Sequence, residues 1–419
     1  MSEVRITPAL LAHAVATATE ALRFAGPADE TLSHYFRKHR ALGQSERAFV
    51  AEAVFAVLRR MRSLEAAAGS SQPRLLVAAA LVRVLGYSGR ALAGLLDDDL
   101  IGRLRAAKGE TFPPAVRAEL PDWLWQRVVA AYGEEEGQRL AQALANPAPL
   151  DLRVNLARAS REDVLARLEA DGLKPRATPH SPAGIRLAGK PAINRHPLFK
   201  EGLIEVQDEG SQLIAWLLAP RRGEMIADYC AGAGGKTLAA AALMRGTGRI
   251  YAFDTSPKRL ASLAPRAARA GITNVHSVVL AAGQDARVKR LAGKLDRVLV
   301  DAPCSGFGTL RRNPELKWRY GPDAVNELVE KQGRILAAAS RLVKPGGRLV
   351  YATCSLLEEE NEKVAAAFGA AHPEFEPLSC QKLLEAQRIA LTTGEYLKLL
   401  PHRHGTDAFF GAVFERRRP

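Results

Sequence analysis

Several features that define common protein classes are scarce or missing in this 419-residue chain. It has only four cysteines, Cys230, Cys304, Cys354 and Cys380, and no Cys-x-x-Cys pair, which argues against a disulfide scaffold and a zinc site. No apolar run reaches the roughly 18 residues of a membrane span. The N-terminus lacks the charged, apolar and small-residue order of a signal peptide. We therefore expect a cytoplasmic protein with reduced thiols, no bound metal and no membrane partner.

The charge is unbalanced, with a net value of +14 at pH 7. Residues 1–150 contain 18 basic and 16 acidic residues, against 41 and 29 in the remainder, so the excess belongs to the C-terminal two thirds. A basic balance favours a polyanionic partner such as nucleic acid, with a solvated basic surface as the alternative. The length predicts two or three domains.

The first part of the chain, residues 1–145, has apolar residues at helical spacing and is expected to be all α. Thr7-Pro8 marks a helix start, and residues 75–85 predict a buried helix. Acidic triplets at 97–99 and 134–136 are interpreted as loops or helix ends, not as metal ligands. After a linker at 146–149, residues 150–215 predict a small α+β module.

In residues 216–419 the pattern changes to alternating strands and helices. Such alternation predicts a mostly parallel, doubly wound sheet. The expected strands are 225–228, 249–254, 275–280 and 298–301, with another beginning at 348, and the expected helices are 236–244, 257–270 and 323–342.

A glycine-rich loop, residues 228–237, lies between an expected strand and helix. Its glycines allow a ligand to approach the backbone closely. Asp254 ends the next strand, where an acid can accept hydrogen bonds from ribose hydroxyls. Together these features predict an adenosine-bearing cofactor, with a plain tight turn as the alternative. The spacing matches neither the nicotinamide fingerprint GxGxxG nor the phosphate loop.

Two cysteines follow expected strands, Cys304 close to the acid Asp301 and Cys354 in the segment after residue 348. The carboxyl edge of a parallel sheet is where ligands bind. A thiolate can add to C6 of a cytosine and make C5 nucleophilic, so that C5 takes a methyl group before a base removes its proton and the thiol leaves. The alternative is that both cysteines are small buried hydrophobes.

Motifs at residues 301–306, 311–319 and 351–355, in that order, resemble the Sun-type (Fmu) RNA cytosine-C5 methyltransferases, which use S-adenosylmethionine. Residues 206–209 and 405–410 are similar to the same family. The helical region resembles the NusB-like RNA-binding domain. The resemblance implies a Rossmann-like S-adenosylmethionine-dependent methyltransferase domain at 216–419, preceded by the NusB-like domain at 1–145 and the module at 150–215. We also expect a monomer.

The resemblance assigns roles to residues of this chain. Cys354 would attack C6, Cys304 would help release the methylated product, and Asp301 would contact the flipped cytosine. The cofactor would be held by Cys230, Ala231, Gly232, Ala233, Gly234, Gly235, Lys236, Asp254, Asp285 and Asp301. Lys258 and Arg259 would border the cofactor, with a surface role as the alternative for Arg259. The RNA phosphates would be held by Arg311, Arg312, Lys317 and Arg319, with a solvated loop as the alternative.

Two adjacent positions depart from the family, whose loop usually has the order Cys-Ala-Ala-Pro-Gly-Gly-Lys-Thr. Here Gly232-Ala233 replaces Ala-Pro, which adds flexibility and removes a constraint on φ, so cofactor binding is expected and its affinity is open. The expected substrate is small-subunit (16S) ribosomal RNA, with the base unpaired or flipped out. Transfer RNA as the substrate and a non-catalytic RNA-binding assembly factor are the alternatives.

Overall fold

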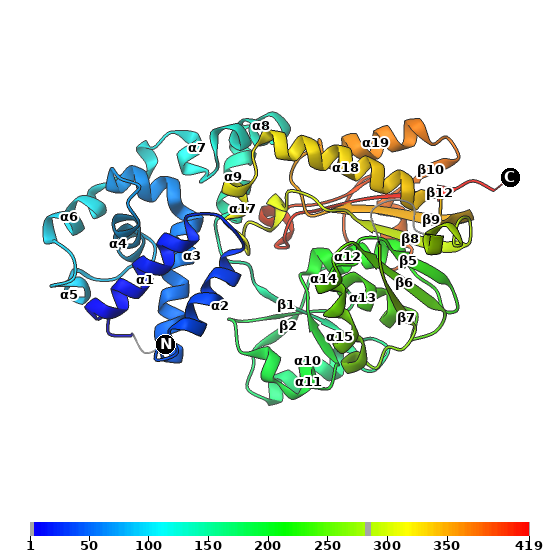
Figure 1. Ribbon diagram of the computed structural model, residues 1–419, viewed down its shortest axis with the longest axis horizontal. Helices are drawn as coiled ribbons and strands as arrows, with labels where there is room; N and C mark the ends of the chain where they lie inside the picture. The colour runs from blue at the N-terminus through cyan, green and yellow to red at the C-terminus, as the bar shows by residue number, and fades with distance from the viewer. Residues whose placement is uncertain (1–3, 281–285, 419) are drawn as a thin grey trace. The chain divides into compact units, whose positions relative to one another are not determined.

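The structure, a computed structural model, describes residues 4–280 and 286–418 (Figure 1). The chain divides into two compact units. The first comprises Met1–Pro147 and Thr309–Pro322, and the second comprises Ala148–Gly308 and Asp323–Pro419. The first division falls inside the linker expected at 146–149. The segment Thr309–Pro322 belongs by its contacts to the first unit, although the rest of the second half of the chain belongs to the second.

The first unit is helical, as the spacing of apolar residues predicted. Its described helices are α1 (Pro8–Ala21), α2 (Ala28–Lys38), α3 (Gln44–Ala68), α4 (Pro73–Arg83), α5 (Gly89–Leu92), α6 (Asp98–Ala106), η1 (Gly109–Thr111), α7 (Pro114–Arg117), α8 (Asp122–Tyr132), α9 (Glu134–Leu144) and α17 (Leu316–Arg319). The Thr7 hydroxyl caps α1 by accepting from the Leu10 N–H at 3.1 Å. The helix expected at 75–85 is confirmed as α4, whose residues 76–82 are buried.

The acidic triplets have the helix-end roles that the sequence predicted. Asp97 caps α6, with its side chain accepting from the Asp99 N–H at 2.9 Å. Residues 134–136 form the first turn of α9, where carboxylates interact favourably with the helix dipole. Among the described residues, no group of three or more His, Cys, Asp or Glu could hold a metal ion. Among the described helices, none has the length and apolar character needed to span a bilayer.

The second unit begins with a four-stranded antiparallel sheet in the order β2-β3-β1-β4. Its strands are β1 (Leu150–Val154), β2 (Pro175–Ala177), β3 (Gly184–Leu187) and β4 (Ile204–Val206), and α10 (Arg161–Ala170), η2 (Ile193–Arg195) and α11 (Pro197–Lys200) complete it. Ser160 caps α10, its hydroxyl accepting from the Asp163 N–H at 3.1 Å. Strand β2 was not predicted from the sequence.

The large sheet has the order β10-β12-β9-β8-β5-β6-β7, with β11 paired to β12. Its strands are β5 (Met225–Asp228), β6 (Arg249–Asp254), β7 (Val275–Val279), β8 (Leu295–Asp301), β9 (Val343–Thr353), β10 (Phe375–Leu378), β11 (Leu397–Leu399) and β12 (Phe409–Arg416). The five strands β5 to β9 are parallel to their neighbours, whereas β12 runs antiparallel to β9. The chain proceeds from β5 in one direction and from β8 in the other, so the β5–β8 boundary is the switch point where such folds bind ligands.

Helices cover both faces of this sheet (Figure 1). They are α12 (Glu209–Leu218), α13 (Gly235–Leu243), α14 (Pro257–Ala261), α15 (Leu263–Ala270), α16 (Ala286–Lys289), η3 (Phe307–Thr309), α18 (Pro322–Ser340), α19 (Glu362–Ala371), α20 (Cys380–Glu385) and α21 (Pro401–His404). Alternate residues of β9 enter different cores: Val350 packs in the core that includes α12 and α13, and Leu349 in the core that includes α18 and α19. The prediction of a single helix at 257–270 is wrong, because the helix is interrupted at Ser262 and forms two shorter helices, α14 and α15.

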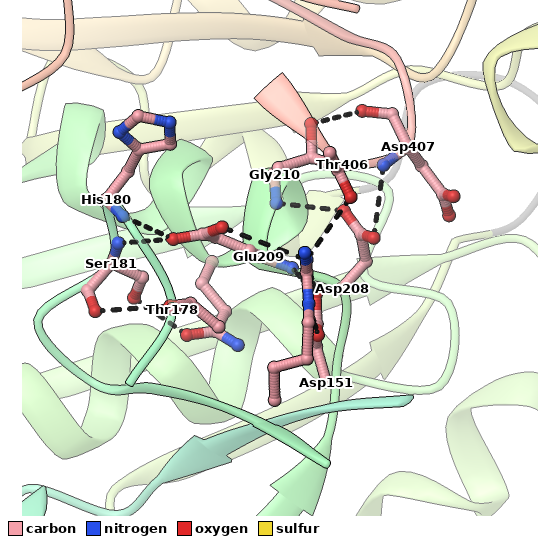
Figure 2. A network of polar contacts seen from close by, with 12 residues as sticks. Asp151, Thr178, His180, Ser181, Asp208, Glu209, Gly210, Thr406 and Asp407 are labelled. Atoms are coloured by element: carbon pink, nitrogen blue, oxygen red, sulfur yellow. Dashed lines mark hydrogen bonds and ion pairs between the residues drawn. The ribbon is translucent and has the colours of Figure 1, made fainter. Parts of the chain in front are cut away.

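A buried polar network joins the small sheet to the large one (Figure 2). Arg186 of β3 forms a two-point ion pair with Asp151 of β1, at 2.6 and 2.7 Å, and also donates to the Gly405 carbonyl at 3.2 Å. Glu209, at the start of α12, accepts from the Ser181 N–H at 2.7 Å. Asp151 and Glu209 are almost fully buried, so these bonds offset the cost of removing their charges from water.

Candidate active site

A cavity of about 430 Å³ opens at the carboxyl ends of β5, β6, β8 and β9. This volume lies in the range of pockets that bind small molecules. The structure brings most of the expected site residues to its walls: Cys230, Ala231, Gly232, Ala233, Gly235, Lys236, Asp254, Arg259, Asp301, Cys304 and Cys354. Gly234 belongs to the same loop but does not line the cavity. Asp285 lies outside the described residues.

The two thiols of this cavity are adjacent. Strands β8 and β9 are parallel neighbours with Asp301 paired to Ala352, so the chain leaves both strands at the same edge shortly before each cysteine. The Sγ atoms of Cys304 and Cys354 are 3.4 Å apart, and both cysteines are free. A Cβ on Gly308 would lie 2.4 Å from the Ala408 carbonyl oxygen, so only glycine fits where the loop after Cys304 passes.

The surroundings of Cys304 and Cys230 raise the pKa values of these two thiols. The hydrogen bond between Cys304 and the neighbouring Cys354 sulfur, together with burial, raises the pKa of Cys304 well above its ordinary value. Burial, with Asp228 nearby, also raises the pKa of Cys230. A thiol with a raised pKa remains protonated near neutral pH and can donate a proton. Cys304 is therefore suited to an acid role and not to that of a thiolate nucleophile.

An ion pair lies beside the thiols. The Lys236 ammonium is 2.7 Å from Oδ2 of Asp301 and 5.2 Å from the centre of the Phe409 ring. Burial alone would lower the pKa of Lys236, but the Asp301 carboxylate outweighs this and raises it. Lys236 therefore stays charged in the cavity and holds Asp301 in place at the end of β8.

Asp254 fixes the glycine loop and faces the cavity. Its Oδ2 accepts from the Gly232 N–H at 2.8 Å, and its Oδ1 accepts from the Ser256 N–H at 2.7 Å. Arg259 reaches the same Oδ1 at 3.0 Å, although its side chain is 60% exposed, so it both borders the cavity and meets solvent. Each carboxylate oxygen has two lone pairs, so Asp254 retains acceptor capacity for a hydroxyl.

The glycine loop depends on two left-handed residues. Gly234 has φ +82°, and a Cβ there would lie 2.2 Å from Cδ1 of Leu263. Gly232 has φ +55° with no atom within 4 Å of a Cβ position, so its backbone conformation alone favours glycine. The departure from Ala-Pro at 232–233 thus matches the conformation that this loop adopts.

Beneath the loop, the buried Asp228 carboxyl ends β5. Burial raises the pKa of Asp228 to about 7, although the Thr237 hydroxyl donates to Oδ2 at 2.7 Å. Asp228 is 4% exposed and does not line the cavity, so its role is to shape the loop.

The four residues expected to hold RNA lie in the segment Thr309–Pro322 of the helical unit. Arg311, Arg312 and Arg319 are half-buried, whereas Lys317 is 3% exposed. The Lys317 ammonium donates to the Arg59 carbonyl at 3.0 Å, and burial lowers the pKa of Lys317 to about 8. This position differs from the solvent-facing one that the phosphate role requires, and it indicates that Lys317 anchors the segment to α3.

Several cavity residues were not predicted from the sequence, notably Ser211, Tyr229, Lys331, Ile335 and Phe409. Phe409 lies within residues 405–410, a segment that resembles the family but to which the resemblance assigned no role. Lys331 and Ile335 lie on α18 at helical spacing, a pattern that also describes any helix packed on a sheet. The sequence therefore contains no signal that distinguishes Lys331 and Ile335 from ordinary packing residues.

Comparison with known proteins places the chain in a family. Residues 215–415 match the family model described as 16S rRNA methyltransferase RsmB/F, and residues 120–194 match the RsmF/B-like ferredoxin-like domain. The chain is 32% identical over 340 residues to ribosomal RNA small subunit methyltransferase B of Vibrio cholerae, covering 78% of this chain and 74% of that protein. The chain belongs to the RsmB/F methyltransferase family.

Other members of the RsmB/F family give the same result. The probable ribosomal RNA small subunit methyltransferase B of Bacillus subtilis is 35% identical over 303 residues, or 71% of this chain. The chain spans 66% of the length of that relative. The solved structure of a methyltransferase homologue from Pyrococcus horikoshii is 30% identical with a TM-score of 0.62, covering 72% of this chain and 97% of that one. The Rossmann-like methyltransferase fold expected from the sequence is thereby confirmed.

S-adenosylmethionine is the methyl donor of the RsmB/F family, and the described residues of the cavity fit it. The left-handed Gly232 leaves open space on the loop, Asp254 offers acceptor oxygens for ribose hydroxyls, and the start of α13 presents backbone N–H groups. The volume suits a molecule of nucleoside size.

Proposed function

We propose that this protein transfers a methyl group from S-adenosylmethionine to C5 of a cytosine in RNA through a covalent adduct with Cys354. The observation that carries the proposal is the pair of Sγ atoms 3.4 Å apart in the cavity that also contains the glycine loop and Asp254. A single buried cysteine would be ordinary packing. Two thiols beside a glycine loop that is suited to cofactor binding favour covalent catalysis.

The proposed reaction divides one difficult step into two. The Cys354 thiolate forms a bond to C6, and the displaced electron pair makes C5 nucleophilic. S-adenosylmethionine, when bound, supplies an electrophilic methyl group for C5. A base then removes the C5 proton, and the electrons of that C–H bond restore the ring double bond as the C6–S bond breaks. Cys304, kept as a neutral thiol, is placed to protonate the departing Cys354 sulfur.

We further propose small-subunit (16S) ribosomal RNA as the substrate, on the basis of the names of the relatives. In this proposal residues 1–145 form a NusB-like RNA-binding domain, residues 150–215 a small α+β module, and residues 216–419 the methyltransferase domain. The net charge of +14 supports an RNA partner. The protein would act as a monomer in the cytoplasm on a cytosine that is unpaired or flipped out of its stack.

The proposal is tested by substituting each thiol. Cys354→Ala should abolish the incorporation of labelled methyl groups into ribosomal RNA, because the nucleophile is lost. Cys304→Ala should leave methylated RNA attached to the protein, seen as a slower band on a denaturing gel, because release is blocked. Nucleoside mass spectrometry should identify the product as 5-methylcytosine.

Cys380→Ala is the matched control, since Cys380 is buried away from the cavity and should leave both results unchanged. Full activity in Cys354→Ala would overturn the role of that residue. Faster methylation of naked transfer RNA than of ribosomal RNA would overturn the substrate. Titration calorimetry that detects no binding of S-adenosylmethionine would favour a non-catalytic RNA-binding assembly factor.

A further inference from the structure

A buried carboxylate lies behind the two thiols. Glu360 is 0% exposed, and its side chain is surrounded by neutral donors. Oε1 accepts from the Ser305 backbone N–H at 2.8 Å and from the Gln332 amide at 3.0 Å. Oε2 accepts from the Ser305 hydroxyl at 2.5 Å and from the Ser355 hydroxyl. Four hydrogen bonds stabilise this carboxylate inside the protein, where a buried carboxylate without hydrogen bonds would reduce the stability of the fold.

The positions of these donors in the chain are informative. Ser305 follows Cys304, and Ser355 follows Cys354. One carboxylate therefore holds the residue next to each thiol, although the two loops are 50 residues apart in sequence. Gln332 of α18 reinforces the arrangement, since its amide also donates to the Pro303 carbonyl at 3.0 Å.

The backbone of Glu360 is itself fixed. The Tyr351 hydroxyl donates to the Glu360 carbonyl at 2.6 Å. The next residue, Asn361, donates through its side-chain amide to the Ser355 carbonyl at 3.1 Å. The carboxylate is therefore held from strand β9 and from its own loop, and it has little freedom to leave either serine.

We propose that Glu360 is a positioning residue that clamps the two cysteine loops together and places a negative charge near Cys304. The clamp explains why the Sγ atoms lie 3.4 Å apart at the ends of separate strands. The inference deepens the proposed function and rests on it for its catalytic part only. Its structural part, the adjacency of the two thiols and the acidity of Cys304, is measurable without RNA.

The charge of Glu360 supports the second half of this proposal. Its carboxylate adds to the effects of Cys354 and of burial in raising the pKa of Cys304. Other ionisable groups around the two thiols include Tyr351 and, lining the cavity, the Lys236–Asp301 pair, Cys230, Asp254, Arg259 and Lys331. With the carboxylate removed, the Cys304 thiol should become more acidic.

The first experiment measures adjacency in the full-length protein. Diamide oxidises two neighbouring thiols to a disulfide and takes up their two electrons and two protons. Peptide mass spectrometry should show rapid formation of a Cys304–Cys354 disulfide in the wild type. Glu360→Ala should slow this at least about tenfold, because the loops separate. Glu358→Gln, a half-buried neighbour two residues earlier, is the matched control and should behave as wild type.

The second experiment measures the acidity of Cys304 in Glu360→Gln, which removes the charge but preserves the side-chain volume and one acceptor oxygen, and so guards against a mere failure to fold. The rate of iodoacetamide alkylation at Cys304 should reach its midpoint at lower pH than in the wild type. At a fixed pH below both midpoints, alkylation should be about tenfold faster for each pH unit by which the midpoint falls, because the thiolate fraction rises in that proportion. A merely structural role would leave this profile unmoved.

The third measurement concerns methyl transfer. Glu360→Gln should lower kcat by about tenfold or more while the KM values for RNA and S-adenosylmethionine stay unchanged, since neither ligand contacts the buried carboxylate. Unchanged disulfide formation in Glu360→Ala and an unchanged alkylation profile in Glu360→Gln would overturn the inference. Absence of cytosine methylation by the wild type, with the thiol results as expected, would instead overturn the proposed function and leave the clamp standing.

Discussion

At the scale of single residues, the chemistry of the cavity depends on buried ionisable groups whose surroundings change their acidity. Cys304 is kept protonated beside a second thiol, Lys236 is kept charged by Asp301, and Asp228 is held at the end of β5 with its pKa raised to about 7. Each effect has a separate cause, respectively a thiol hydrogen bond, an opposite charge and desolvation.

Asp228 should make stability depend on pH. Its folded pKa of about 7 lies above its ordinary value of 3.8, so between these values the folded state binds more protons than the unfolded one. Stability should therefore fall as pH rises from about 4 to 7, and the cost should be complete above that range. Asp228→Asn, which cannot ionise, should gain on the order of 2 kcal/mol relative to wild type between pH 5 and pH 8.

Urea unfolding of both proteins at pH 5, 6.5 and 8 measures this difference. If the difference in unfolding free energy between variant and wild type does not change with pH, the pKa of Asp228 is not raised in the folded state. Thr237→Val serves as a control, because it removes the hydrogen bond to Asp228 but leaves the ionisable group in place.

At the scale of elements, the parallel strands could be predicted because their apolar runs end in turn residues and acids. The antiparallel strands β10, β11 and β12 were missed, since β10 and β11 are only four and three residues long and all three strands depend on pairing between segments distant in sequence. The break at Ser262 was missed for a related reason. Helical spacing continues across it, and only the structure shows that α14 and α15 are separate.

The ion pair between β1 and β3 allows a test at this scale (Figure 2). The side chain of Asp151 is 0% exposed and that of Arg186 is 11% exposed. Arg186→Ala should lower the free energy of unfolding by about 3 to 5 kcal/mol, because it leaves a buried carboxylate without its cation. The double variant Asp151→Asn/Arg186→Met should recover part of this loss, since it also removes the Asp151 carboxylate that the single variant leaves without its cation.

Denaturant unfolding monitored by circular dichroism measures both changes. The matched control is Arg139→Ala on α9, where the pair with Glu135 is exposed and the expected loss is below about 1 kcal/mol. Equal losses in Arg186→Ala and Arg139→Ala would show that the network does not join the two sheets energetically.

At the scale of the whole molecule, the basic charge should govern RNA binding. Arg311→Ala and Arg312→Ala should each weaken binding and reduce the slope of log K against log salt by about 0.7 to 1, because each loses one phosphate contact. Lys317→Met should leave that slope unchanged, since its ammonium is buried against the Arg59 carbonyl. Fluorescence anisotropy with a labelled RNA at several salt concentrations measures the slopes. If either arginine variant binds with an unaltered slope, the side chain of that arginine does not contact an RNA phosphate.

The sequence by itself determined the helical first part, the alternating second part, the glycine loop and the two strand-end cysteines, because each is encoded by neighbouring residues. The tertiary structure decided which groups lie within bonding distance across long separations. It placed Cys304 against Cys354, buried Lys317 and brought Glu360 to both cysteine loops. No local pattern could supply these contacts, since they depend on which strands pair and on how the loops beyond them pack.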